Sequence, residues 1–246
     1  MTTQTLELNE AIEALYAAFR KYRRAEVRDE YRCPEEDNSY ARYLAQTPLK
    51  QLSGVDLISF QVGMGWRFVN DSDFKMLLPR MLDVCAQGEG SLDLLGSYCR
   101  LQACAFDKWH DVERKAVQDF TRALLAEAIR HRFAPKLVRP LDVFEIVECA
   151  ALCEIDVVPL LDEWTATRHP ELASSFADHV LLNQWRLLDA RRWGGLTELD
   201  LPNPVAAWVR SGRAGRFLLS AVEAYPGHPD CGHWAEAHDV LDALGV

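Results

Sequence analysis

The stretch that most constrains the fold of this chain runs from residue 49 to residue 87 and has the pattern of a helical hairpin. Ser53 and Asp56 have the spacing of a capping box, in which the serine accepts a backbone N–H and the acid reaches back to the helix start. This spacing predicts a helix that begins at about Gly54. Apolar residues then follow at intervals of three and four, which places them on one buried face: Leu57, Phe60 and Met64.

A second helix is predicted to follow a turn at residues 66–70. Asp71 or Ser72 is its predicted cap, because short polar side chains accept the free N–H groups of a first turn. Apolar residues recur at helical spacing and form the predicted buried face: Phe74, Leu77, Leu78, Met81, Leu82 and Cys85. Pro79 lies inside this run and lacks the N–H that bonds back one turn, so we expect a kink or a break there.

Polar residues of the same hairpin form a candidate binding site: Trp66, Asp71, Asp73, Lys75 and Arg80. One interpretation is structural, with Arg80 paired to Asp56 or Asp73 through a bidentate contact that fixes the hairpin. The other is a recognition patch, since tryptophan and arginine are enriched among the residues that dominate binding. The residue pattern leaves both interpretations open.

Helical periodicity continues along the rest of the chain, and the alternation typical of strands is scarce. Further helices are predicted at 8–22, 39–45, 91–105, 107–133, 141–153, 157–167, 170–190, 204–224 and 232–244. Asn9 is the predicted cap of the first of these, and a division is expected at 211–215. The chain is therefore predicted to be all-α, either a multi-helix bundle or an irregular α-solenoid of antiparallel helix pairs.

Two prolines, Pro135 and Pro140, indicate a boundary between the halves of the chain. We expect an N-terminal helical subdomain over residues 1–135 and a C-terminal one over residues 140–246. Pro140 suits the start of the next helix because its fixed φ is already helical. The two subdomains are expected to pack into one compact unit.

The formal net charge of −10 argues against a nucleic-acid partner, because such a protein needs lysine and arginine to displace counterions from phosphates. The acids are also unevenly placed. Residues 141–164 hold seven acids and no lysine or arginine, and neither residue type follows Arg216. Such segments are either solvated helix faces or an acidic surface that steers a basic partner.

Other features of the sequence indicate a cytoplasmic protein that does not contact a membrane. No apolar run approaches the roughly 18 residues needed to span a bilayer. Acids interrupt the apolar positions of the first thirty residues, which is unlike a signal peptide. Most cysteines lie in apolar helical patterns, as reduced thiols do when they pack as small hydrophobic groups.

Three residues near the C-terminus have the chemistry of a zinc site: His228, Cys231 and His233. The alternative is a proline- and glycine-rich loop that happens to hold polar residues. Three others are weaker candidates for an acid–base group: Glu145, Glu148 and His179. A further alternative is a small-molecule pocket under Trp66 and Phe74.

The run DFKMLLPR at residues 73–80 resembles the D-F-K/R-x-F-L-P-R signature of an uncharacterised family of bacterial all-helical proteins. Other segments agree in order along nearly the whole chain: LYAAFRKY at 15–22, WHDVERKAVQDFTRALL at 109–125 and VAAWVRSGRAGRFLLSAVEAYP at 205–226. The resemblance implies a helical fold. It implies no activity, because none is established for the family.

These patterns favour a protein–protein interaction module that binds a basic protein partner and needs no cofactor. A protein that masks a toxin, as an immunity protein or antitoxin does, is one instance of this class. The alternative is a metal-binding protein or an enzyme that uses His228, Cys231 and His233.

Overall fold

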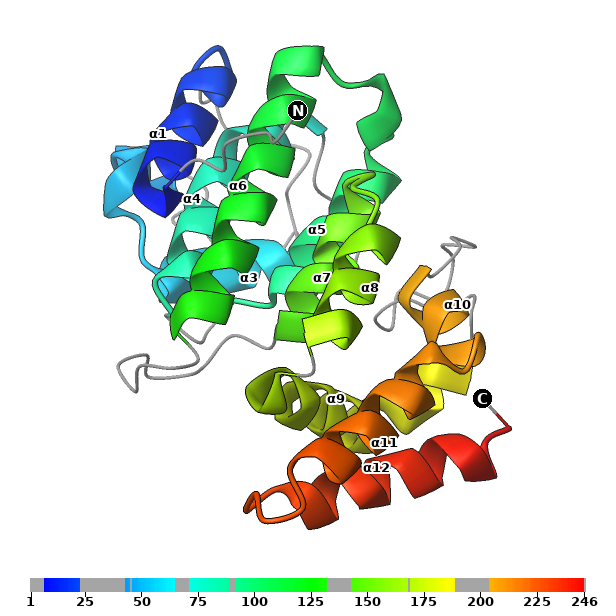
Figure 1. Cartoon of the computed structure of the whole chain (residues 1–246). Coiled ribbons are helices and arrows are strands. Elements are labelled where there is room, and N and C mark those ends of the chain that lie inside the picture. The colour runs from blue at the N-terminus through cyan, green and yellow to red at the C-terminus, as the bar shows by residue number, and fades with distance from the viewer. Residues whose placement is uncertain are drawn as a thin grey trace. The chain divides into compact units, whose positions relative to one another are not determined.

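The computed structural model describes residues 7–22, 43–44, 46–64, 71–88, 92–131, 143–167, 169–188 and 204–245. Within these ranges the regular structure is helical and includes no strand, which confirms the all-α prediction (Figure 1). In the same ranges, no helix has both the length and the apolar character needed to cross a membrane. The chain divides into two compact units, Met1–Leu141 (unit 1) and Asp142–Val246 (unit 2). The linker predicted at 135–140 lies outside the described residues.

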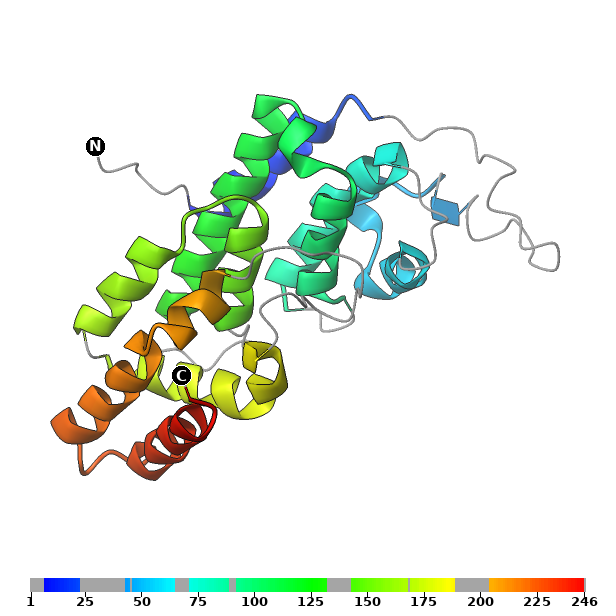
Figure 2. The same ribbon diagram turned by 90° about the vertical axis from the view of Figure 1, so that its right-hand side faces the viewer.

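Unit 1 is built around its fourth element. Its helices are α1 (Leu8–Phe19), the 3-10 turn η2 (Leu49–Gln51), α3 (Gly54–Met64), α4 (Asp71–Ala86), α5 (Leu94–Ala103), the 3-10 turn η3 (Phe106–Lys108) and α6 (Asp111–His131). α4 packs against α1, η2, α3 and α5, and α1 also lies along α6 (Figures 1 and 2). Residues 43, 44 and 46 are helical, and most of the predicted 39–45 helix lies outside the described residues.

The predicted capping box forms at the start of α3, which begins at Gly54 as expected. Asp56 Oδ2 accepts hydrogen bonds from the Ser53 hydroxyl and backbone N–H, both at 2.7 Å. In return, the Asp56 backbone N–H donates to Ser53 Oγ at 3.2 Å. The bonds from the Ser53 hydroxyl and backbone lower the pKa of the Asp56 carboxyl, because they favour its charged form.

The start of α1 differs from the prediction. The helix begins at Leu8, and its first backbone bond runs from the Ala11 N–H to the Glu7 carbonyl at 3.0 Å. Asn9 therefore lies inside the first turn, where it does not act as the N-cap. Glu7 holds the cap position with an extended backbone and no capping side-chain bond.

α4 is continuous through Pro79, so of the predicted kink or break the break is wrong, and the kink stays a prediction. The helix continues although Pro79 has no backbone N–H to bond back one turn. Every residue from Leu77 to Cys85 is buried, so tertiary packing holds the second half of the helix in place. Burial of these side chains offsets the roughly 3 kcal/mol that a proline inside a helix costs.

Trp109 is the centre of the aromatic core of unit 1. Its ring centroid lies 5.3 to 6.2 Å from those of three residues, all in edge-to-face contact: Phe19, Phe74 and Phe106. The indole N–H donates to the Cys104 carbonyl at 2.8 Å, so the polar group of this buried side chain is satisfied. The cluster joins α1, α4 and η3 around one side chain.

The helices of unit 2 pack around one long helix, α9. Its helices are α7 (Val143–Leu152), α8 (Val158–Thr167), α9 (Pro170–Leu188), α10 (Pro204–Arg210), α11 (Arg213–Ala224) and α12 (Cys231–Ala243). α9 packs against α7, α10, α11 and α12, and α11 and α12 lie side by side (Figures 1 and 2). The core contains Phe144, Phe176, Trp208, Phe217 and the fully buried Trp234.

The bounds of the unit 2 helices lie within two residues of the predicted ones, apart from the division of the 204–224 helix. That division falls at Ser211 and Gly212, inside the segment predicted for it. Gly212 has a φ of 72°, a left-handed conformation that costs a residue with a Cβ atom about 1 kcal/mol or more. A glycine is therefore what allows α10 to turn directly into α11.

The Gly212→Ala substitution is expected to destabilise the protein by about 1 kcal/mol, because alanine is strained at a positive φ. Its Cβ atom would also lie 3.2 Å from the Arg216 guanidinium. Gly232→Ala is the matched control, since Gly232 is helical and a Cβ atom there meets nothing within 4 Å. The control should be neutral or stabilising by up to about 1 kcal/mol. Urea denaturation followed by circular dichroism measures both, and equal effects of the two substitutions would contradict the argument.

Candidate functional site

The structure does not gather the predicted binding residues into one exposed patch. The charged groups of Lys75 and Arg80 lie inside unit 1, with side chains 12% and 10% exposed. Asp71 is exposed and Asp73 half-buried in the first turn of α4. Trp66 lies outside the described residues. A buried charge needs a partner inside the protein. The burial of Lys75 and Arg80 therefore favours the structural interpretation, in which these residues fix the hairpin.

Arg80 is the centre of a buried network, which we call the Arg80 network. Its Nε donates to the Leu52 carbonyl at 2.6 Å, and a terminal nitrogen donates to Asp83 Oδ2 at 2.7 Å. Asp83 also accepts hydrogen bonds from the Tyr16 hydroxyl at 2.8 Å and from the Gln87 amide at 2.7 Å. The carboxylate partner is thus Asp83, three residues along the same helix, and the predicted pairing with Asp56 or Asp73 is wrong.

Lys75 is the centre of a second network, the Lys75 network, which joins α1, α4 and α6. Its ammonium group lies 3.0 Å from Glu113 Oε2 and 4.0 Å from the Trp109 ring centroid. Glu113, whose side chain is 1% exposed, also accepts a hydrogen bond from the Tyr22 hydroxyl and pairs with Lys21, both at 2.7 Å. Three donors therefore converge on one buried carboxylate.

These contacts set the ionisation of both the carboxylate and its phenol donor. Burial alone raises the pKa of Glu113, but hydrogen bonds from Lys21, Tyr22 and Lys75 outweigh it, and the net effect lowers that pKa. Burial and the bond to Glu113 raise the pKa of Tyr22. Tyr16 has a raised pKa for the same two reasons, with Asp83 as its partner. Both phenols therefore remain neutral beside their carboxyl partners.

Glu113 was missed by the sequence reasoning, although the sequence contains a signal for it. The residue lies four positions after Trp109 and three or four before Ala116 and Val117, all of which are buried. That spacing places an acid on the buried face of α6. An acid at an apolar position of a helix predicts a buried cationic partner, because an unpaired charge is costly to bury.

The predicted zinc residues have other partners in unit 2. The His228 ring stacks on Trp234 at 4.7 Å, and its Nδ1 accepts the Asp230 backbone N–H at 3.2 Å. His233 Nε2 lies 2.8 Å from Asp178 Oδ1 on α9. Among the described residues, no three histidine, cysteine, aspartate or glutamate side chains are placed to hold a metal ion together.

The segment that contains the predicted zinc residues, 228–234, also contacts α9. The Ser174 hydroxyl donates to Asp230 Oδ2 at 2.6 Å, and the Trp234 indole N–H donates to Ser174 Oγ at 3.0 Å. Cys231 has a free thiol and is half-buried at the start of α12. Of the three residues that suggested zinc, His233 contributes to this contact between the two helices, through Asp178.

The acid–base candidates also lie inside unit 2. Glu148 and His179 are both buried, and His179 Nε2 lies 4.0 Å from Glu148 Oε1. The His179 ring packs on Phe144 with centroids 5.5 Å apart, while Glu145 is half-buried. This placement suits a buried polar contact between α7 and α9 better than a site open to substrate.

The two units differ in net charge. Residues 142–246 hold 17 acidic residues and 7 lysines and arginines, whereas residues 1–141 hold 20 of each, so unit 2 carries the whole net charge of −10. One of its cations, Arg213, is engaged by Asp162, whose two carboxylate oxygens lie 3.1 Å from a guanidinium nitrogen. Asp162 also accepts the indole N–H of Trp208 at 3.2 Å.

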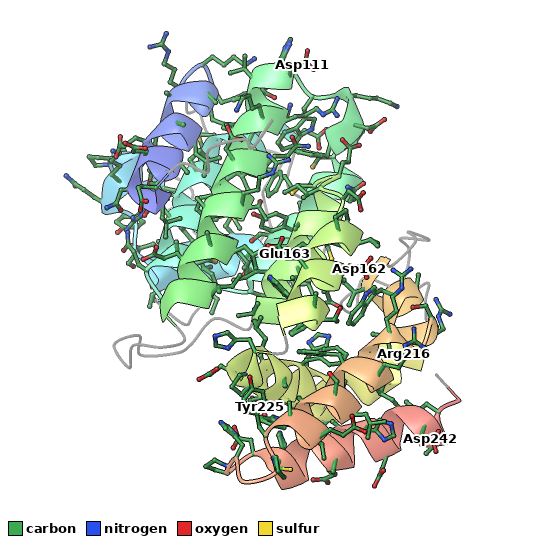
Figure 3. All side chains as sticks on the ribbon, viewed as in Figure 1. Asp111, Asp162, Glu163, Arg216, Tyr225 and Asp242 are labelled. Atoms are coloured by element: carbon green, nitrogen blue, oxygen red, sulfur yellow. The ribbon has the colours of Figure 1, made fainter. Side chains whose placement is uncertain are left out.

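The clearest acidic surface lies on α12. Glu236, Asp239 and Asp242 are all exposed and share one side of the helix, opposite the buried residues Trp234, Ala237 and Leu241. We call these three residues the acidic face. Figure 3 labels Asp242 near the end of the helix. His238 Nδ1 lies 3.6 Å from Asp239 Oδ1.

These acids occupy positions that electrostatics disfavours within the helix itself. The C-terminal end of a helix attracts cations and repels anions, yet the last turn of α12 contains Asp242 and no basic residue. Asp239 and Asp242 are also three residues apart, where like charges destabilise a helix by a few tenths of a kcal/mol. α11 has the same feature, since Glu223 lies in its last turn with no basic residue.

The Glu113→Gln substitution is expected to destabilise the protein by about 3 kcal/mol at pH 7, because it leaves Lys75 buried without its carboxylate. Because the pKa of Glu113 is lowered by folding, its contribution is present above the ordinary value of 4.5 and is lost as pH falls through the folded value. The stability difference between the two proteins should therefore shrink on acidification. Urea denaturation from pH 7 to pH 3 measures this.

Glu10→Gln is the control for that substitution. Glu10 is exposed on α1, and removing its charge should change the stability by less than about 0.5 kcal/mol. A Glu113→Gln effect as small as the control, or one that stays constant down to pH 3, would contradict a role for the ionised carboxylate.

Comparison of this chain with family models, with curated proteins and with solved structures finds no match. The resemblance of residues 73–80 to a bacterial helical family therefore stays a prediction, and the candidate sites rest on the geometry of the chain itself.

Proposed function

We propose that this chain is a protein–protein interaction module whose unit 2 binds a basic protein partner through the acidic face of α12. The observation that carries the proposal is the placement of Asp239 and Asp242 near the end of a helix that would be more stable with cations there. A sequence under selection for stability alone has no reason to keep that arrangement. A cationic partner would turn the same charges into favourable contacts.

The distribution of charge supports a partner of this class. The whole net charge of −10 belongs to unit 2, and its long-range field raises the rate at which a basic protein encounters the surface. A protein that masks a basic toxin, as an immunity protein does, is one instance of the class.

The proposal predicts that neutralising the acidic face removes the partner and leaves the fold intact. The test is affinity capture from the cytoplasm of the source cell with the triple variant Glu236→Gln, Asp239→Asn, Asp242→Asn. The wild type should retain a stoichiometric basic protein, and the variant should lose at least tenfold in affinity for it. The stability of the variant should be unchanged or slightly higher, because like-charge repulsion is relieved.

A triple variant of unit 1 is the matched control, since it changes the net charge by the same amount: Glu10→Gln, Asp107→Asn, Asp111→Asn. It should bind like the wild type. With the purified partner, the association rate should fall as salt is added, because screening weakens steering. Recovery of no stoichiometric partner, or equal binding by both triple variants, would refute the proposal.

A further inference from the structure

Unit 1 contains a half-open hollow of about 290 Å³ between α1, α4 and the segment that leads into η2. Its walls are Tyr16, Phe19, Arg20, Tyr22, Pro48, Leu49, Met76 and Pro79. Most of this lining is apolar. The hollow thus offers a concave apolar surface with few polar groups, as sites for small ligands do.

The two tyrosines of the hollow cannot recognise an anion. The Tyr16 hydroxyl donates its proton to Asp83 and the Tyr22 hydroxyl donates to Glu113, so neither proton is available to a ligand. Tyr22 also accepts a bond from the Lys75 ammonium group at 3.3 Å. What remains on the phenol oxygens is acceptor capacity, which an anionic group does not use.

Arg20 is the polar group that distinguishes this site. It is exposed at the C-terminal end of α1, and among the described residues no carboxylate is paired with its guanidinium group. The other cations around the hollow have partners: Lys50 binds Glu13, and Lys21 binds Glu113. An apolar hollow edged by a guanidinium group that has no carboxylate partner in the described part of the chain is complementary to a molecule with an apolar body and a single negative charge.

We propose that this hollow binds a small monocarboxylate with an apolar body, its carboxylate on Arg20 and its body against Phe19, Leu49 and Met76. A volume of about 290 Å³ equals roughly ten water molecules at about 30 Å³ each, which sets the ligand at about ten non-hydrogen atoms. The planar guanidinium group matches a carboxylate through two parallel hydrogen bonds. A dianionic phosphate would need further donors, and the described walls provide none beyond Arg20.

The experiment is calorimetric titration of the full chain with 3-phenylpropionate and with its neutral amide, 3-phenylpropanamide. The acid should bind the wild type with a dissociation constant below about 1 mM, as expected for a ligand of this size. The amide should bind at least tenfold more weakly. In the Arg20→Gln variant, acid and amide should bind equally weakly, because the charge that distinguishes them is gone.

Two further variants make the result specific to this hollow. Arg122→Gln removes an exposed arginine elsewhere in unit 1 and should bind the acid like the wild type. Leu49→Trp fills the hollow and should abolish binding, with an unchanged urea midpoint showing that the fold is intact. Equal binding of acid and amide by the wild type, no saturable binding of the acid, or unaltered binding by Leu49→Trp would overturn the proposal. The outcome is independent of the interaction proposed for unit 2.

Discussion

The structure of unit 1 depends on the burial of two positive charges on α4. Lys75 and Arg80 both have their charged groups inside the unit, where an ion without a partner would cost several kcal/mol. Each is therefore matched with a carboxylate, Glu113 for one and Asp83 for the other. Because the partners come from α6 and from α4 itself, satisfying the charges also fixes how the helices are placed.

The two networks also fix α1 at two points. Tyr16 bonds to Asp83 of α4, and Tyr22, just beyond the end of the helix, bonds to Glu113 of α6. Phe19 lies between these tyrosines in the chain and packs on Trp109. The apolar hollow lies between these two attachment points, so it is a consequence of the same contacts that hold α1 in place.

Local features of the fold could be predicted from the sequence, because they depend on residues close together in the chain. The capping box at Ser53 and Asp56 and the helices of unit 2 are examples. The polar contacts could not be predicted, because they depend on which helices pack together. Lys75 and Glu113 are 38 positions apart, and no spacing rule connects them. The prediction for Arg80 failed differently, since its partner Asp83 is three residues along the same helix, whereas the two predicted partners precede the proline.

Pro79 shows how packing overrides a local preference. A proline inside an isolated helix removes a hydrogen bond and crowds the preceding turn, which is why the sequence predicts a kink or a break. In α4 the residues from Leu77 to Cys85 are buried, so a break would expose apolar surface that the continuous helix hides. The continuous helix also keeps Arg80 and Asp83 one turn apart, the spacing on which the Arg80 network depends.

The two units use charge in opposite ways, and this contrast is the main reason to assign them different roles. In unit 1 the positive and negative residues are equal in number, and its most buried ions are paired with one another. In unit 2 the acids exceed the bases, and those of α12 face solvent where the helix dipole repels them. Internal pairing contributes to the fold of unit 1. Uncompensated surface charge contributes nothing to the fold of unit 2, and a partner of opposite charge is the physical condition under which it becomes favourable.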